Sequence, residues 1–555
     1  MSNFKVFIMS IISVFVLYDC AHQVAPSGGE EDMIPPDIVE FYPANGTVNF
    51  SENYFEITFS EYVQKSSVRE AIFISPKIKG ELDYSWSGKS LEVEFDEQLK
   101  PNTTYTVTIG TDVQDYNNRN KMAEPRTFVF STGDKIDIGQ ISGRVYDKKP
   151  SGVMVYAYKE IDTLVNPMQQ EPDYISQVGD NGKYFFKGLG YGEYYILAIR
   201  DDFRNYLYNV GEDDYGAPYK KVLLNETDST FSDLDFQLTK EDTVPPNIIS
   251  VTMTDIAHFL IEFSEYIDSS KINTENFFVY DSTQSQRHEL KYFYKGTAKP
   301  KNLFVTIEDS LNQDNSNFII SKNLWDLHGN RLGESETPFV VNENPDTVAA
   351  VVKNVKTEFD NKLMDNENAW AEIMFDDGFD KSVLSESVGL FYEDKPVQIS
   401  TTPIDNSTFI VKSLEPLKDN KEFKLKIDLS NFVDTKNNKT DSVYTIVLKT
   451  KNKLDYSGLS GKIENQGSNE VVVNLNGIEN NGRNYTVIAD SSGVYNFKRV
   501  VPGRYLVWSF LDTQKDSVYN YGKVFPFKSS ERFIYYPDTL DLKPRWPVGD
   551  VELSF

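Results

Sequence analysis

Apolar and polar residues alternate over short stretches along most of the chain. Leu91, Val93 and Phe95 are separated by two glutamates. Residues 303–307 and 409–411 repeat this arrangement. Strict period-two alternation predicts β-strands with one buried face and one solvated face. Turn-forming residues recur about every 8–12 positions, and no segment has a convincing helical period. The pattern therefore predicts an all-β protein.

One sequence unit occurs three times. It contains a strand that ends in Phe-Ser-Glu or Phe-Asp-Asp and, further on, an aspartate that opens a turn. The strand copies lie at residues 57–63, 261–267 and 372–379, and the turns begin at Asp115, Asp326 and Asp434. Repetition at this spacing predicts one β-sandwich plan used three times. The predicted modules are residues 34–133, 244–343 and 346–452, of which the last is the loosest copy.

A second unit fills the remaining sequence. Residues 141–147 recur at 459–465, and residues 182–201 recur at 493–512. In the longer segment, Gly182, Tyr184, Phe186 and Asp201 each match a residue 311 positions later, as do several of their neighbours. The repeat predicts two further modules, at residues 138–240 and 456–555.

The two units resemble known module families. The first resembles the S-layer-type bacterial Ig-like module, and the second is similar to the carboxypeptidase regulatory-like, transthyretin-like sandwich. The resemblance implies an array of five β-sandwiches in the order Ig-like, regulatory-like, Ig-like, Ig-like, regulatory-like.

The N-terminal residues predict export. Lys5 precedes an apolar run at residues 6–17, which is too short to span a bilayer but suits a secretory signal. Cys20 follows directly, with Leu17 three positions before it, and this arrangement resembles a bacterial lipoprotein signal. The resemblance implies a signal peptide at 1–19, a lipid on Cys20 and a polar tether at 20–33. The alternative is an ordinary signal peptide with an incidental cysteine.

The tether narrows the resemblance to lipoproteins of the Bacteroidota. Cys20 and Ala21 are followed by a Pro-x-Gly-Gly, an aspartate and a Pro-Pro pair at residues 26–36, as in that family. The resemblance implies anchoring in the outer membrane by lipid, on either its periplasmic or its surface face.

Composition argues against several classes of function. The 555 residues carry 84 acidic and 56 basic side chains, a net charge of −28, so nucleic acid is not an expected partner. One cysteine excludes internal disulfides, and four scattered histidines leave little for acid–base chemistry. The Gly-rich stretch at 188–192 is followed by a strand pattern, so no cofactor is expected. We therefore expect a protein without catalytic activity.

The acidic loop of the first regulatory-like module offers a candidate metal site. Asp201, Asp202, Asp213 and Asp214 cluster there in sequence, and calcium binds clustered carboxylates. The same reasoning applies to the turns at Asp115, Asp326 and Asp434. The alternatives are a solvated acidic loop for the first set, and turn capping by the aspartate side chain for the second.

Two further features suggest surface chemistry. Near the C-terminus, Arg545 and Trp546 are candidates for a surface that recognises glycans or proteins, unless Trp546 closes the last sandwich. Asp-Ser/Thr followed by a small aliphatic residue or Thr occurs at nine places and is similar to the O-glycosylation acceptor of Bacteroidota. Thr243 and Thr347, beside module boundaries, are the best candidates. The alternative is that the aspartate caps a turn before a strand.

These observations together predict a non-catalytic lipoprotein of the outer membrane. We expect it to act as a scaffold or interaction module, with proteins of the cell envelope as partners. The alternative is a glycan-binding surface lipoprotein of a polysaccharide-utilisation system.

Overall fold

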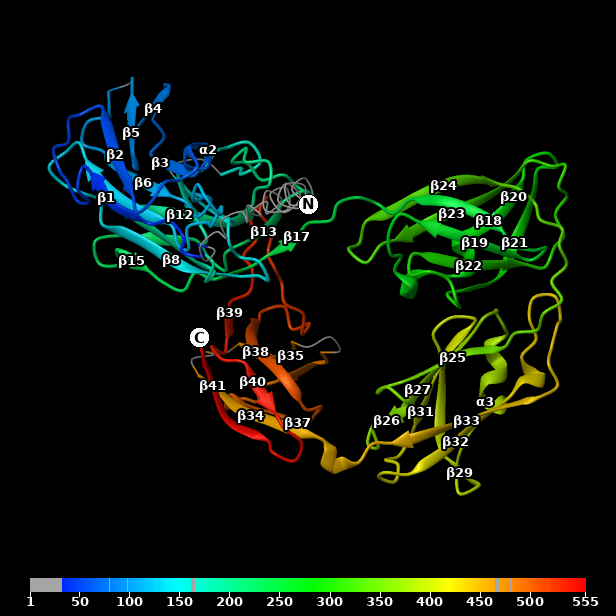
Figure 1. The fold of residues 1–555 in the computed structure, drawn as a ribbon. Coiled ribbons are helices and arrows are strands. Elements are labelled where there is room, and N and C mark those ends of the chain that lie inside the picture. The colour runs from blue at the N-terminus through cyan, green and yellow to red at the C-terminus, as the bar shows by residue number, and fades with distance from the viewer. Residues whose placement is uncertain are drawn as a thin grey trace, which may run out of the picture. The chain divides into compact units, whose positions relative to one another are not determined.

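The computed structural model describes residues 32–555 except 79, 97, 161–164, 465, 466, 468 and 479–481. Nearly all regular structure in them is β, and the sheets form a tandem series of sandwiches, so the predicted fold class is confirmed (Figure 1). Cys20, the predicted signal peptide and most of the tether lie outside the described residues. Among the described residues, no helix is long and apolar enough to cross a membrane.

The chain divides into two compact units. The described part of unit 1 comprises residues 32–207, 215–238 and 524–526, and unit 2 comprises residues 208–214, 239–523 and 527–555. The described residues form five separate hydrophobic cores. Their buried residues come from 50–130, 141–236, 253–324, 350–448 and 459–553.

We name the modules after the resemblances described above. The first Ig-like module, predicted at residues 34–133, has two sheets, and Phe55, Ile57 and Phe59 lie in its core. One sheet has the order β1-β2-β5-β4 and the other β3-β6-β7. The elements are β1 (Ile38–Tyr42), β2 (Tyr54–Phe59), α2 (Lys65–Glu70), β3 (Ile72–Ser75), β4 (Leu82–Ser87), β5 (Ser90–Phe95), β6 (Thr104–Ile109) and β7 (Arg126–Ser131).

The second Ig-like module differs because its strands form one continuous sheet, in the order β18-β19-β22-β21-β20-β23-β24. The long strand β21 pairs with β20 through its first half and with β22 through its second half. The partner changes between Glu289 and Leu290, and the register with β22 then shifts between Leu290 and Tyr292. The strands are β18 (Ile248–Met253), β19 (His258–Phe263), β20 (Phe277–Asp281), β21 (Gln286–Tyr294), β22 (Asn302–Ile307), β23 (Asn317–Trp325) and β24 (Arg331–Phe339).

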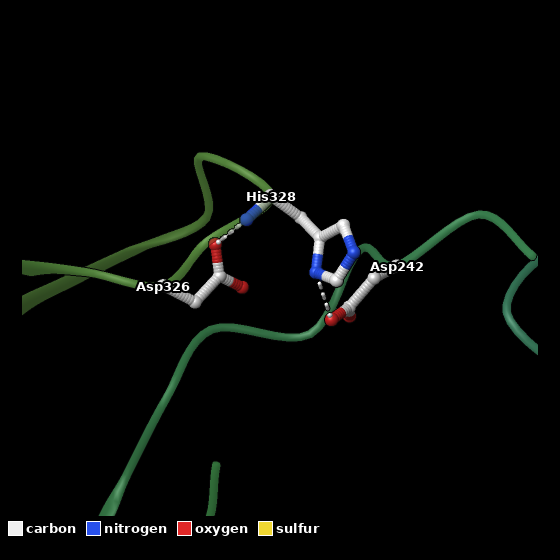
Figure 2. Close-up of side chains that lie close together, drawn as sticks. All are labelled: Asp242, Asp326 and His328. Atoms are coloured by element: carbon white, nitrogen blue, oxygen red, sulfur yellow. Dashed lines mark hydrogen bonds and ion pairs between the residues drawn. The ribbon is translucent and has the colours of Figure 1, made fainter. Parts of the chain in front are cut away.

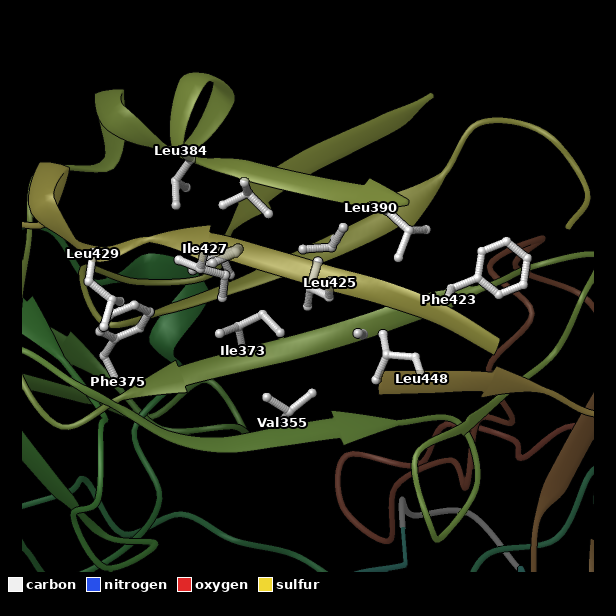
Figure 3. Packing of buried hydrophobic residues seen from close by; sticks show 14 of the residues in the cluster. Val355, Ile373, Phe375, Leu384, Leu390, Phe423, Leu425, Ile427, Leu429 and Leu448 are labelled. Carbon is white, nitrogen blue, oxygen red and sulfur yellow. The ribbon is translucent and has the colours of Figure 1, made fainter. Parts of the chain in front are cut away.

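The third Ig-like module is well packed although its sequence is the loosest copy. Four phenylalanine rings, Phe375, Phe379, Phe409 and Phe432, contact one another in its core and are fully buried. Figure 3 shows this core, with Ile373 among the buried side chains. Burial of each such side chain contributes about 1.5–3 kcal/mol.

The sheets of this third module have the orders β25-β27-β31-β30 and β26-β33-β32-β28-β29. The elements are β25 (Val352–Thr357), β26 (Leu363–Met364), β27 (Trp370–Phe375), α3 (Leu384–Ser387), β28 (Val388–Tyr392), β29 (Lys395–Val397), β30 (Ile399–Pro403), β31 (Thr408–Ser413), β32 (Glu422–Asp428) and β33 (Val443–Thr450).

The two regulatory-like modules share a detail of their first strands. A Cβ atom at Gly143 would lie 2.1 Å from the carbonyl oxygen of Leu234, and one at Gly461 would lie 1.8 Å from that of Val551. Only glycine permits this approach of the closing segment. In each module the closing strand then lies parallel to the first strand, as β16 beside β8 and as β41 beside β34.

The strands of the first regulatory-like module are β8 (Gly139–Tyr146), β9 (Met154–Glu160), β10 (Tyr174–Gln177), β11 (Lys183–Leu189), β12 (Gly192–Arg200), β13 (Asp214–Gly216), β14 (Val222–Leu224), β15 (Thr230–Phe231), β16 (Phe236–Gln237) and β17 (Thr239–Lys240). Those of the second are β34 (Ser457–Glu464), β35 (Glu470–Gly477), β36 (Asn484–Ile488), β37 (Val494–Val500), β38 (Gly503–Asp512), β39 (Phe533–Tyr535), β40 (Leu540–Leu542) and β41 (Val548–Ser554).

Candidate functional site: charged clusters at the module joints

Each Ig-like module holds the chain that enters it in the same way. The turn aspartates, Asp115, Asp326 and Asp434, are all buried and accept hydrogen bonds from backbone N–H groups of their own turns. An asparagine of each turn then donates to the carbonyl oxygen of an aspartate that precedes the module. These contacts are Asn120 to Asp32 at 2.8 Å, Asn330 to Asp242 at 3.1 Å and Asn438 to Asp346 at 3.2 Å. We call Asp32, Asp242 and Asp346 the entry aspartates.

A third acid approaches each of these pairs. Glu61 and Glu265 follow the repeated Phe-Ser, and Asp377 takes their place in the third copy. Burial is the largest cause that raises the pKa of Glu61 and of Glu265, and the charges of the entry and turn aspartates raise it further. The repeat therefore gathers three carboxylates from three segments of the chain.

The second Ig-like module places a histidine beside two of these acids (Figure 2). His328 Nδ1 lies 3.1 Å from Asp242 Oδ2, and the backbone N–H of His328 donates to Asp326 Oδ1 at 2.8 Å. Asp326 Oδ2 accepts from the side-chain amide of Asn330 at 2.8 Å. Asp242, Asp326 and His328 offer ligand atoms that all lie within 4.8 Å of one another, a spacing that would suit a metal ion.

The joint between the second and third Ig-like modules contains a buried histidine. His258 Nδ1 lies 2.8 Å from Asp255 Oδ1, and His258 Nε2 lies 2.8 Å from Oδ1 of Asp377 in the next module. The hydroxyl of Tyr294 also donates to Asp377, at 3.0 Å. Burial alone would lower the pKa of His258, but the two carboxylates outweigh burial and raise the pKa to about 10. The ring is therefore an imidazolium that ties two modules together.

The joint between the first Ig-like and first regulatory-like modules is centred on an anion. Asp112 Oδ1 lies 2.7 Å from Lys121 Nζ, and Asp112 Oδ2 accepts from Gln177 at 2.8 Å and from Arg204 at 2.7 Å. Lys121 belongs to the Ig-like module, whereas Gln177 and Arg204 belong to the regulatory-like module. Burial pulls the pKa of Asp112 upward, but these donors outweigh it and hold the pKa below its ordinary value.

The joint between the third Ig-like and second regulatory-like modules is centred on a guanidinium. Arg499 binds Asp365 through two nitrogens, at 2.7 and 3.1 Å, and Glu367 at 2.9 Å. The guanidinium also lies over the ring of Tyr456, 4.2 Å from its centroid. Bidentate pairing fixes orientation as well as distance.

The structure gives the aspartates of the predicted calcium loop structural contacts. Asp201 accepts from the Tyr156 hydroxyl at 2.7 Å and from the backbone N–H of Tyr206 at 2.8 Å, and Asp213 accepts from a neighbouring N–H. Asp201 and Asp202 belong to unit 1, and Asp213 and Asp214 to unit 2. Among the described residues, the two groups spaced to hold one ion include none of these four. Calcium at this loop stays a prediction.

The predicted glycosylation sites lie on exposed linkers. Thr243 and Thr347 are both exposed, and each follows an entry aspartate whose Oδ1 accepts from the backbone N–H two residues on. The turn-capping interpretation therefore has the required geometry, and modification of either threonine stays a prediction.

The C-terminal candidates have different surroundings. The residue Trp546 is 76% exposed, so the alternative that it closes the last sandwich is wrong. The backbone N–H of Arg545 donates to the Tyr456 carbonyl, and its Nε donates to the Leu454 carbonyl at 3.3 Å. An exposed indole beside an arginine is compatible with recognition of a ligand.

Sequence reasoning missed His258, Asp112 and Arg499 as functional residues. His258 and Asp377 are 119 positions apart and belong to different modules. A signal existed for Asp377, because it replaces the glutamate of the other two copies. No comparable pattern marks its partner, His258.

Comparison with known proteins adds one family. Residues 32–132 match the model of the bacterial Ig-like domain. This part of the chain is similar to that domain. No curated protein matches the chain.

Solved structures give only distant likenesses. The N-terminal part of the bacterial S-layer protein SbsC is 13% identical, with a TM-score of 0.17, over 37% of this chain and 44% of that one. Domains 1–6 of SbsC are 10% identical over 92% of this chain and 67% of that one, with a TM-score of 0.16. BcpA, the major pilin subunit of Bacillus cereus, is 10% identical over 75% and 99%, with a TM-score of 0.14. The chain spans less than half of the first of these structures, and scores this low carry no argument about function.

Proposed function

We propose that this protein is a non-catalytic scaffold, anchored in the outer membrane by lipid on Cys20, that presents its modules to protein partners in the cell envelope. The observation that carries the proposal is the construction of the joints. Within each unit, a charged side chain is held between neighbouring modules by two or more oppositely charged or polar groups, as at Asp112, His258 and Arg499.

Joints of this kind bury charged groups, which is unfavourable in free energy. We expect them only where the relative position of two modules matters. Burying a charge requires partners in good geometry, and flexible linkers would join independent modules without that requirement. Fixed spacing of several surfaces is what a scaffold needs. The net charge of −28 favours partners with basic or neutral surfaces over nucleic acid.

Isolation of the intact protein from membranes in mild detergent tests this function. We expect other envelope proteins to co-purify in fixed ratio, and we expect Cys20→Ser to release the protein from the membrane fraction with its fold unchanged. Purification of the lipidated protein without any partner would contradict the scaffold. Retention of the Cys20→Ser variant in the membrane pellet would contradict the anchor.

The exposed Trp546 favours a second candidate function, glycan recognition. Indole rings stack on apolar sugar faces, and this one is free of the core. Binding to a glycan array that is lost in Trp546→Ala, with unchanged thermal stability, would favour this function over the scaffold.

A further inference from the structure

Charge is not balanced at the joint between the second and third Ig-like modules. His258 pairs with Asp255 and Asp377, and Lys353 pairs with Asp376 at 3.0 Å. Two more carboxylates, those of Asp346 and Asp434, form no ion pair with any lysine, arginine or histidine in the described part of the chain.

Both of these carboxylates also leave one oxygen without a hydrogen bond. Asp346 Oδ1 accepts from the Val348 N–H at 3.3 Å, and Asp434 Oδ1 accepts from two N–H groups of its own turn at 2.8 Å. Oδ2 of each residue is buried and has no hydrogen-bond partner among the described residues. Asp434 is only 1% exposed. A buried carboxyl oxygen without a partner is strongly unfavourable, so each of these atoms needs a ligand.

The two residues belong to one cluster. Asn438 links them, because its backbone N–H donates to Asp434 and its side-chain amide donates to the carbonyl oxygen of Asp346. Asp434 and Asp377 repel the Asp346 carboxylate, and His258 attracts it. Asp346 also lines a cavity of about 350 Å³ at the joint.

The equivalent pair in the second Ig-like module shows what the third module lacks. There, His328 pairs with Asp242 (Figure 2). The Asn330 amide binds Oδ2 of Asp326. The residue equivalent to His328 in the third module is Lys436. Its ammonium group is bound instead to the backbone carbonyl of Glu308, at 2.7 Å. The basic side chain at this position of the third module is therefore bound elsewhere and forms no ion pair with the entry aspartate.

We infer that Asp346 and Asp434 bind a calcium ion at this joint. Calcium accepts irregular sets of six to eight oxygen ligands, which two carboxylates, backbone carbonyls and water from the adjoining cavity can supply. A divalent ion balances two carboxylates, and magnesium is less suitable because it demands a near-ideal octahedron. With two charged ligands the affinity belongs with extracellular modules, at a Kd of about 10⁻⁴–10⁻³ M.

Thermal unfolding and limited proteolysis of the full chain test the site, with calcium chloride as the probe. We expect millimolar calcium to raise the melting temperature and to slow cleavage within residues 343–349 several-fold. EDTA should reverse both effects, and the same concentration of magnesium should produce little change. No response at about 10 mM calcium, well above the expected Kd, would overturn the inference.

Matched variants locate the ion. Asp434→Asn and Asp346→Asn each keep an amide oxygen to accept the existing N–H bonds and remove one charge. Each should abolish the calcium response and, without calcium, should resist cleavage better than the unaltered protein because repulsion is relieved. Asp83→Asn removes one charge from the exposed face of β4, away from the joints, and should leave the calcium response intact. Equal loss of response in all three variants would place the ion elsewhere. If Asp434→Asn fails to fold, Asp346→Asn on the linker decides the question.

Discussion

Two joints between modules are centred on buried side chains of opposite charge. At the first joint, the anion Asp112 is surrounded by Lys121, Gln177 and Arg204. At the joint between the second and third Ig-like modules, the cation His258 is surrounded by Asp255 and Asp377. The difference lies in what remains if the central charge is removed. The side chains of Lys121 and Arg204 are 49% and 39% exposed and can be solvated, whereas Asp377 is 12% exposed and cannot.

The comparison shows that the exposure of the surrounding side chains determines how much stability is lost when the central charge of a joint is removed. Removal of one partner of a buried ion pair leaves an uncompensated charge, and that charge causes most of the cost. An exposed partner is instead solvated by water, so its charge adds little to the loss of stability. The joint at His258 should therefore lose more stability than the joint at Asp112 when its central charge is removed.

The largest expected effect is that of His258→Ala. It leaves two carboxylates facing each other at the joint, so the free energy of unfolding should fall by about 3–5 kcal/mol. Denaturant unfolding of the full chain and the rate of proteolysis at residues 343–349 measure this. His328→Ala is the control, because His328 is exposed and its pairing with Asp242 is worth about 0–1 kcal/mol. Equal losses in the two variants would contradict the comparison.

Asp112→Asn should have a smaller effect. The amide keeps the shape of the side chain but loses the charge, and the two cations that remain are solvated. We expect a loss of about 1.5–3 kcal/mol, the contribution of hydrogen bonds to a charged group. Hydrogen exchange of residues 104–112 and 174–178 would report loosening of this joint. Asp83→Asn, on the exposed face of β4, is the control and should change nothing measurable.

The two joints should respond to pH in opposite directions. The pKa of His258 is raised from about 6.5 to about 10, so its contribution is complete below the unfolded value and is lost as pH rises through the folded one. Asp255, Asp377 and Tyr294 face the ring, and Asp346 offers an oxygen within 4.8 Å of it. The pKa of Asp112 is lowered, so its contribution is present above about pH 3.9 and is lost as pH falls further.

Hydrogen exchange, corrected for its intrinsic dependence on pH, separates these effects. Alkaline solution should loosen the joint at His258 while the joint at Asp112 holds, and acid should weaken the joint at Asp112. In His258→Ala the alkaline transition at the former joint should disappear. Its persistence would assign the transition to another group.

The smallest expected effect is that of Tyr294→Phe. This variant removes the hydroxyl that donates to Asp377 but keeps the stacked contact with Phe304, so it should cost about 1 kcal/mol. In denaturant unfolding, the Tyr294→Phe variant should be much more stable than the His258→Ala variant. A loss as large as that of His258→Ala would mean that the tyrosine, and not the imidazolium, carries the joint.

The sequence allows prediction of features that repeat and of little that crosses between modules. Alternation at residues 91–95 predicted β5, because strand periodicity is local. The continuous sheet of the second Ig-like module was not predicted, since it depends on β21 pairing with β20 along one half and with β22 along the other. The turn aspartates were recognised as caps, but their assembly with the entry aspartates was not.

The contacts at the joints could not be predicted from the sequence, for a physical reason. A contact such as that of His258 with Asp377 depends on the orientation of two folded modules, which no periodicity records. The sequence left the exposure of Trp546 open, because an aromatic residue at this place is compatible with either a buried or an exposed position.

The parallel closing strands of the regulatory-like modules have a mechanical consequence. In the first of these modules the chain enters through β8 and its closing strand β16 lies parallel to β8, with Phe236 paired to Val145 and Gln237 to Tyr146. Tension between the ends of such a module pulls the two strands along their length in opposite directions. The hydrogen bonds between them are then loaded together in shear and cannot be peeled apart one at a time. A module built in this way resists extension until these hydrogen bonds fail together.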